Sequence, residues 1–336
     1  MIERLNPAPG HDASVLVLGR AGMDLYPSVD GGEIEDTQAL TTDVGGSAGN
    51  IAVGLARHGV PVGLISALSG DAVGRFVRRR LEAAGVDLTH VATVAGDPRT
   101  SLALAEVRDR DCEVVIYRNN AADLQITADA VDRTALARVG YLIVTGTALV
   151  AEPSRSAALA WMKMARDAQA HVLLDLDYRA YSWPDRDQTE AIYMAAVALS
   201  DVLVGNDEEF ALIAGGQSIE ARLRAFASQG RVCILKRGSN GSVVFTREHE
   251  PEHIGVFPVA SKKPYGAGDA FLAGVVARLS AGDALVDAAT VGSAAAAIVV
   301  SQRGCAAAMP TPDQIRQFIE ANDISEARGQ DAHQTL

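Results

Sequence analysis

The segment that decides the fold is Lys263-Pro-Tyr-Gly-Ala-Gly-Asp-Ala-Phe-Leu-Ala-Gly274. It contains three small residues in a row, Gly266, Ala267 and Gly268. They precede Asp269 and an apolar run that is typical of a buried helix. Their backbone N–H groups would therefore lie at a helix N-terminus, where anions bind favourably. Asp269 could accept a proton from a hydroxyl there, while the amides stabilise the charge on a transferring phosphoryl group.

This segment also has simpler interpretations. Asp269 could act only as a helix cap. A dinucleotide-binding G-x-G-x-x-G fingerprint would need its third glycine where the chain has Phe271, and no G-x-x-x-x-G-K-[ST] motif occurs. The sequence therefore disfavours a Rossmann dehydrogenase and excludes a P-loop enzyme.

Short apolar runs alternate with amphipathic segments along most of the chain. The runs, which are typical of strands buried on both faces, are residues 15–18, 62–67, 141–145, 171–175, 202–205 and 232–235. The segments between them are long enough for crossover helices and are residues 49–58, 73–84, 153–168, 190–199 and 219–228. This alternation predicts an α/β fold with a doubly wound, mostly parallel sheet flanked by helices.

Two regions interrupt the alternation. Residues 101–107 and 112–117 flank the charged segment 108–111 and predict an antiparallel hairpin. The segment 26–44 is polar and contains a turn signal at Gly31-Gly32. We expect these regions to form a small β-sheet lid.

The lid is expected to comprise about residues 24–44 and 99–120, inserted into one domain of residues 13–323. Residues 324–336 have few apolar groups and no periodicity, which predicts a flexible tail. The chain therefore has one catalytic domain in this interpretation.

Composition excludes several classes of protein. The 336 residues carry 30 Lys+Arg and 42 Asp+Glu, a formal net charge of −12, and no basic run suits a phosphate backbone. The three cysteines are widely spaced and predict neither a disulfide framework nor a zinc site. No stretch reaches the ~18 apolar residues of a membrane span, and the N-terminus lacks a secretory signal pattern. We expect a cytoplasmic protein without nucleic-acid or membrane partners.

Five motifs, in their order along the chain, resemble those of the ribokinase-like (PfkB) sugar kinases. Asp24 matches the family's acidic residue after the first strand, and Gly45-Gly-Ser-Ala-Gly-Asn50 matches its substrate motif. The Asn-x-x-Glu motif is Asn206-Asp-Glu-Glu209, and the nucleotide loop is Lys236-Arg-Gly-Ser-Asn-Gly241. Gly266-Ala-Gly-Asp269 completes the set, so the resemblance covers roughly residues 15–320 and implies a ribokinase-like fold.

The resemblance implies a role for each motif. Substrate would be bound by Asp24, Gly45, Gly46 and Asn50. ATP would be bound by Asn206, Lys236, Gly238 and Gly241, and Mg²⁺ would be positioned through water by Asn206 and Glu209. Asp269 would be the catalytic base, and the Gly266, Ala267 and Gly268 amides would hold the phosphoryl oxygens.

Two of these assignments have alternatives. Asn206 and Glu209 have the spacing of a helix capping box, a role that can coexist with metal binding. Lys236 could extend from its strand end towards solvent, with its backbone rather than its ammonium contacting ATP. Asp175 and Asp177 could face the cleft at a strand end or form salt bridges with nearby arginines.

Four segments narrow the resemblance to the branch that phosphorylates the 6-hydroxyl of 5-dehydro-2-deoxy-D-gluconate in myo-inositol breakdown. They are residues 45–50, 117–123, 175–183 and 263–266. A sugar acid carries a carboxylate, which a guanidinium or an ammonium can bind. The cations in these segments are Arg118, Arg179 and Lys263. We expect at least one of them to bind the carboxylate, with the two arginines ahead of Lys263.

Lys263-Pro-Tyr265 departs from the wider family. Many ribokinase-like enzymes have Asp-Thr-Thr at these positions, and their Asp helps to form a monovalent cation site. Lys263 could replace the charge of that cation, reach the substrate, or be a solvated surface lysine.

Other activities share some of these features. A kinase for 2-keto-3-deoxygluconate or a related hexose has the same catalytic motifs, whereas a nucleoside kinase would need more aromatic residues. A non-catalytic sugar-acid sensor would not need the intact Gly-Ala-Gly-Asp and Asn-x-x-Glu motifs. The resemblance also implies that two copies can pair through the lid, because relatives often dimerise in that way.

Overall fold

The apolar runs form a nine-stranded sheet in a computed structural model that describes residues 5–8, 10–29, 31–107, 112–130, 133–263 and 265–325. The strand order is β13-β12-β11-β10-β9-β8-β1-β4-β5. Neighbouring strands from β5 to β11 pair in parallel, and only the β11-β12 and β12-β13 pairs are antiparallel. The strands are β1 (Asp12–Leu18), β4 (Val62–Ser69), β5 (Val91–Val94), β8 (Val139–Thr145), β9 (His171–Asp175), β10 (Val202–Asn206), β11 (Val232–Lys236), β12 (Ser242–Phe245) and β13 (Glu252–Ile254).

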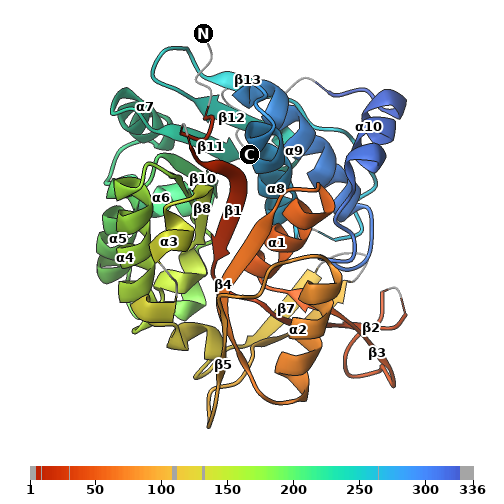
Figure 1. Cartoon of the computed structure of the whole chain (residues 1–336). Helices are drawn as coiled ribbons and strands as arrows, with labels where there is room; N and C mark the ends of the chain where they lie inside the picture. Colours follow the sequence, from red (N-terminus) through yellow and green to blue (C-terminus); the bar gives the residue numbers. More distant parts are fainter. Residues whose placement is uncertain are drawn as a thin grey trace.

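Helices cover both faces of this sheet, as the sequence predicted (Figure 1). One core contains Val15 and Val17 of β1 and the helices α1 (Ser47–Arg57), α2 (Ala72–Ala83), α8 (Ala267–Ser280), α9 (Leu285–Val300) and α10 (Pro312–Ala321). The opposite core contains Leu16 and Leu18 and the helices α4 (Ser154–Asp167), α5 (Arg186–Ala198), α6 (Asp207–Leu212) and α7 (Ile219–Ser228). A short helix, α3 (Arg133–Leu136), precedes β8. Successive residues of β1 therefore face opposite layers, as in any strand buried on both sides.

Helices α8 and α9 approach each other closely because their contact is made by glycines. A Cβ atom added to Gly274 would lie 3.0 Å from the Cα atom of Gly292. The two backbones therefore meet almost directly, with no side chain between them. This arrangement suits a chain with many small residues and few aromatics.

A separate four-stranded sheet has the order β3-β2-β6-β7 and lies beside α2 (Figure 1). Its strands are β2 (Gly22–Pro27), β3 (Leu40–Gly45), β6 (Leu102–Val107) and β7 (Cys112–Tyr117). The β6-β7 pair is antiparallel, which confirms the predicted hairpin, although its turn at 108–111 lies outside the described residues. The predicted small sheet is thus present, and we call it the lid sheet.

The predicted domain ends at residue 323, and the structure describes the chain as far as residue 325. Residues 326–336 of the predicted tail are outside the described part of the chain. Ser325 also falls in the predicted tail, but the structure describes it: its backbone N–H donates to the carbonyl oxygen of Val256 at 2.9 Å. Within the described ranges, no helix has the length and apolar character needed to cross a bilayer.

Candidate active site

A cleft of about 1160 Å³ opens between the lid sheet and the carboxyl ends of the parallel strands. Ala103 and Ala105 of β6 line one wall, and Asp175, Asn206 and Lys236, the last residues of β9, β10 and β11, line the other. Ligands of open α/β sheets bind at this edge. Pockets for one small ligand usually measure ~300–1,000 Å³, so this cleft has room for two.

The structure brings most of the predicted site residues together in this cleft. The lining includes Asp24, Gly46, Asn50, Arg179, Asn206, Glu209, Lys236, Gly238, Gly241, Gly266, Ala267, Gly268 and Asp269. Gly45 lies directly behind Asp24, since a Cβ atom on Gly45 would be 1.7 Å from the Asp24 Oδ1 atom. Any side chain at position 45 would therefore displace the Asp24 carboxylate.

Asp269 lies in the first turn of α8, after the predicted turn of small residues. Gly266 is the N-cap of α8 and has φ 79°, a left-handed conformation that favours glycine. The Asp269 Oδ2 atom accepts a 2.8 Å hydrogen bond from Asn50 Nδ2. Burial, reinforced by the carboxylates of Asp177 and Asp175, raises the pKa of Asp269 to about 7. A carboxyl group with that pKa is suited to act as a base near neutral pH.

The polar groups beside Asp269 leave one acceptor without a partner. Asn50 lies in α1, and its Oδ1 atom is buried and has no hydrogen-bond partner among the described residues. A substrate hydroxyl could donate to this atom, because a buried orphan acceptor is otherwise costly. Asp24 accepts a 3.2 Å hydrogen bond from the Tyr26 hydroxyl, and burial raises the Asp24 pKa. Asn50 and Asp24 are therefore suited to bind hydroxyl groups.

Two ion pairs balance the acidic groups at the centre of the cleft. Lys236 Nζ lies 3.2 Å from Asp175 Oδ1, and Arg179 Nη2 lies 2.8 Å from Asp177 Oδ1. Asp177 also accepts a hydrogen bond from the hydroxyl of Ser47. The prediction that Asp175 and Asp177 face the cleft or pair with arginine is confirmed, since Asp177 does both.

Lys236 also reaches the turn in front of α8. Its Nζ atom lies 3.1 Å from the position that a Cβ atom on Gly268 would occupy. Nearby Asp175 and Glu209 raise the pKa of Lys236 against the opposing effect of burial, so its ammonium is charged. A positive charge beside the turn is well placed to attract phosphate oxygens.

The Asn-x-x-Glu motif forms the capping box that the spacing allowed. Asn206 Oδ1 accepts from the Glu209 N–H at 2.9 Å, and Glu209 Oε2 accepts from the Asn206 N–H at 2.8 Å. Both side chains still line the cleft. Burial raises the pKa of Glu209, with Asp177 adding to the effect.

The far end of the cleft has small and apolar walls. A Cβ atom on Gly241 would lie 2.1 Å from the carbonyl oxygen of Ile254, so a larger residue is excluded there. The next residue, Ser242, has a buried hydroxyl with no partner among the described residues. The walls include Val256, Phe257, Ala296, Ala297 and Val300. A flat apolar ring could lie against the small residues of α9.

Comparisons with known proteins agree with this geometry. Residues 12–312 match the model of the pfkB family carbohydrate kinases. The chain belongs to that family. It is similar to 5-dehydro-2-deoxygluconokinases of Photobacterium profundum (40% identity, covering 92% of this chain and 95% of the relative) and Geobacillus kaustophilus (36%, covering 91% and 93%). Its fold resembles a putative ribokinase II from E. coli in complex with ATP and Mg²⁺ (TM-score 0.83, 22% identity, covering 92% and 99%).

Arg118 and Lys263 are not among the residues that line the cleft of this pfkB-family chain. The Arg118 side chain, 8% exposed, is bonded to the Asp123 carboxylate and to the Thr147 carbonyl oxygen at 2.9 Å. Lys263 is 2% exposed, so its interpretation as a solvated lysine is wrong. Binding of a substrate carboxylate by either residue stays a prediction, and their positions do not favour it.

Lys263 instead supports the turn that precedes α8. Its Nζ atom donates a 2.6 Å hydrogen bond to the carbonyl oxygen of Tyr265 and lies 3.8 Å from the Sγ atom of Cys305. Asp24 is close enough for the Lys263 charge to lower its pKa. The Lys263 ammonium therefore fixes the backbone next to Gly266 and offsets the negative charge of Asp24.

Sequence reasoning missed Arg20, Ser47 and Tyr26, which also line the cleft. Arg20 follows β1 by two residues, so the rule that ligands lie beyond the carboxyl ends of strands could have identified it. Ser47 begins α1 inside the predicted substrate motif. Tyr26 alternates with Asp24 on β2, which puts both on one face of that strand.

We predict that Lys263→Met lowers kcat at least tenfold without a matching rise in KM. The substitution leaves the Tyr265 carbonyl without its buried donor, which costs about 1–3 kcal/mol and disturbs the turn. Steady-state kinetics of ATP-dependent phosphorylation measure the effect. Lys262→Met, at the exposed neighbouring position, is the matched control and should behave like the wild type. Equal kinetics for both variants would contradict the assignment.

Proposed function

We propose that this carbohydrate kinase transfers the γ-phosphoryl group of ATP to the 6-hydroxyl of 5-dehydro-2-deoxy-D-gluconate. The names of the relatives that match over nearly their whole length support the substrate. The observation that carries the mechanism is the buried Asp269 carboxyl, held by Asn50 beside the Gly266 turn. Asp269 is the base, and the turn provides amides for the phosphoryl oxygens.

In the proposed reaction, Asp269 accepts the proton of the 6-hydroxyl as that oxygen bonds to the γ-phosphorus. The bond from this phosphorus to the oxygen bridging it to the β-phosphorus breaks, and ADP leaves. The ammonium of Lys236 and the amides of Ala267 and Gly268 stabilise the charge on the transferred group. The lid sheet reduces access of water, which would otherwise compete with the hydroxyl and hydrolyse ATP.

Mg²⁺ is the divalent ion that fits the proposed nucleotide site. In nucleotide sites Mg²⁺ keeps several waters and uses one or two carboxylates together with phosphate oxygens. The described residues contain no cluster of three or more side chains able to hold a metal by themselves, so this mode is the one that suits the cleft. Glu209 and Asn206 would hold the ion through water. When bound, it neutralises part of the triphosphate charge.

The direct test is Mg²⁺-ATP-dependent release of ADP with several sugars in parallel. We expect turnover of 5-dehydro-2-deoxygluconate in preference to 2-keto-3-deoxygluconate, fructose and ribose. Asp269→Asn should lower kcat by ~10²–10⁴ with the fold intact, because the amide cannot accept the proton. Circular dichroism of both proteins is the control for folding. A near-normal kcat would refute the base, preference for another sugar would refute the substrate, and binding without ADP release would favour a sensor.

The pH dependence should report the ionisation of the same carboxyl group. Because Asp269 acts as a base when deprotonated and its pKa is about 7, kcat/KM should fall about tenfold per unit as pH drops below 7. Asp177 raises this pKa, so Asp177→Asn should shift the fall in kcat/KM at acidic pH to lower pH, whatever the maximum value of kcat/KM in this variant. A fall that does not shift in this variant would contradict its assignment to Asp269.

We also propose that two copies of the chain pair through the outer face of the lid sheet. Val114 and Ile116 of β7 line the cleft, so Val115 and Tyr117 alternate onto the other face, where they are 46% and 58% exposed. Exposed apolar side chains on a sheet favour association with a matching surface. Light scattering should give the mass of a dimer for the wild type and of a monomer for Val115→Lys. A monomeric wild type would refute this pairing.

The cytoplasm is the proposed location of this activity. Cys112, Cys233 and Cys305 form no disulfide bond within the described part of the chain, which suits a reducing compartment. ATP, the proposed phosphoryl donor, is supplied there.

A further inference from the structure

Among the described cations that line the cleft, Arg20 lacks an ion-pair partner. The others are Arg179, which pairs with Asp177, and Lys236, which pairs with Asp175. The only polar side chain bonded to the Arg20 guanidinium within the described residues is Ser101, at 3.4 Å from Nη1 to Oγ. This contact is long and uncharged, so Arg20 can still bind an anion with several of its N–H groups.

Arg20 lies at the lid end of the cleft. It belongs to the loop between β1 and β2, and its backbone oxygen accepts a hydrogen bond from Gly49 N–H at the start of α1. Its charge lowers the pKa of Asp24, so the two side chains are close, although no ion pair joins them. The Asp24 carboxylate is instead bonded to the Tyr26 hydroxyl.

Arg179 lies closer to the reacting groups. Asp177, Glu209 and Asp269 all raise its pKa, so its guanidinium lies among the acids around the base. A carboxylate bound there would add negative charge next to Asp269 and to the incoming triphosphate. The terminal hydroxyl and the carboxylate of a six-carbon acid are at opposite ends of one chain. When the hydroxyl is at Asp269, the carboxylate therefore belongs at the other end of the substrate site.

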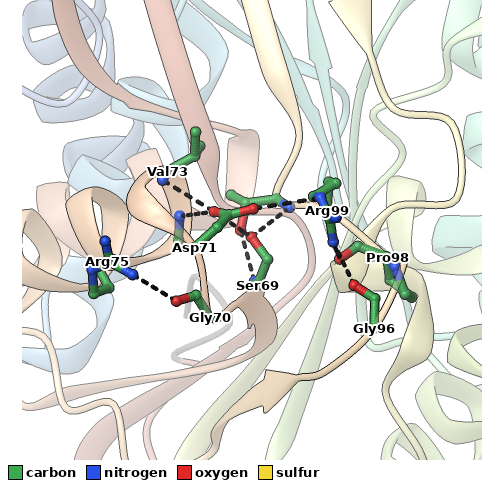
Figure 2. Close-up of polar contacts among 10 residues, drawn as sticks. Ser69, Gly70, Asp71, Val73, Arg75, Gly96, Pro98 and Arg99 are labelled. Atoms are coloured by element: carbon green, nitrogen blue, oxygen red, sulfur yellow. Dashed lines mark hydrogen bonds and ion pairs between the residues drawn. The ribbon is translucent and has the colours of Figure 1, made fainter.

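A buried hydrogen-bond network fixes the partner of Arg20. Ser69 N–H donates to the Thr100 Oγ1 atom at 2.8 Å, Thr100 N–H donates to the Ser69 Oγ atom at 3.1 Å, and the Ser69 hydroxyl donates to Asp71 at 2.8 Å. Figure 2 shows Ser69, the last residue of β4, and Asp71, the N-cap of α2, beside Arg99 on the segment that leads to β6. The chain at residues 99–101 is thus attached to the large sheet, which holds Ser101 in place beside Arg20.

We propose that Arg20 binds the carboxylate of the sugar-acid substrate and so makes the kinase selective for acids over neutral sugars. Asp24 and Asn50 would take the hydroxyl groups between this carboxylate and the terminal hydroxyl at Asp269. The inference rests on the proposed function, because it requires an acidic substrate. It replaces Arg118 and Lys263 as candidates, since neither lines the cleft.

The experiment compares 5-dehydro-2-deoxygluconate with its neutral C1 amide in wild type, Arg20→Gln, Arg20→Lys and Arg179→Gln. Arg20→Gln should raise KM for the acid by about 10- to 100-fold and change KM for the amide less than threefold, because only the acid loses a charge-assisted contact. Arg20→Lys should fall between wild type and Arg20→Gln. Arg179→Gln should lower kcat for acid and amide alike.

Matched controls separate loss of folding and loss of charge from loss of the site. Arg316→Gln removes one exposed arginine on α10 that does not line the cleft, and should retain the wild-type preference. Unchanged amide kinetics in Arg20→Gln show that this variant folds. An equal rise in KM for acid and amide, or selective loss of the acid in Arg179→Gln instead, would overturn the role of Arg20.

The wild type alone tests the proposed function. If it prefers 2-keto-3-deoxygluconate, the proposed substrate fails, and the same comparison of acid and amide with that sugar still decides the role of Arg20. If it phosphorylates only neutral sugars, both the proposed substrate and the selectivity assigned to Arg20 are overturned. Selective loss of the acid in Arg20→Gln supports the inference with either acid.

Discussion

The hydrogen bond from Asn50 to Asp269 is the interaction on which the rest of the site depends. It joins the first part of α1 to the first turn of α8, two helices more than two hundred residues apart in sequence that lie in the same layer of the fold. The parallel sheet brings the starts of these two helices to one edge. Gly46 and Gly266, the residues before α1 and α8, let both segments turn into the cleft. The bond orients the carboxylate, while burial makes it basic enough to accept a proton near neutral pH.

Charge in the cleft is arranged in two zones. Around Asp269, acids outnumber cations, and each cation there is already held by a carboxylate. Such pairing keeps Lys236 and Arg179 charged and in position before a nucleotide arrives, which lowers the cost of organising the site during the reaction. At the lid end, Arg20 and the buried Lys263 oppose Asp24. A ligand with one anionic end at Arg20 and a neutral hydroxyl at Asp269, joined by hydroxyl-bearing carbons, matches this distribution.

The sequence was sufficient for the fold and for most of the site, and the reasons are local. Runs such as Val202–Asn206 are apolar at every position but the last, and the Gly266 turn requires residues without bulky side chains. Arg118 could not be placed in this way, because its partners Asp123 and Thr147 and its burial result from packing between segments. Lys263 was uncertain for the same reason. Arg20 was overlooked, although its place two residues after β1 could have identified it, because ligands lie beyond the carboxyl ends of such strands.

The direct contact between Gly274 and Gly292 has a consequence for the dimensions of the cleft. Helix α8 begins at the turn beside Asp269, and helix α9 ends next to that turn, with Ala296, Ala297 and Val300 in the wall of the cleft. Since the two helices touch through their backbones, side-chain rotations cannot change the distance between turn and wall. The turn and this wall therefore form one rigid unit, and its dimensions are set by the backbones of the two helices.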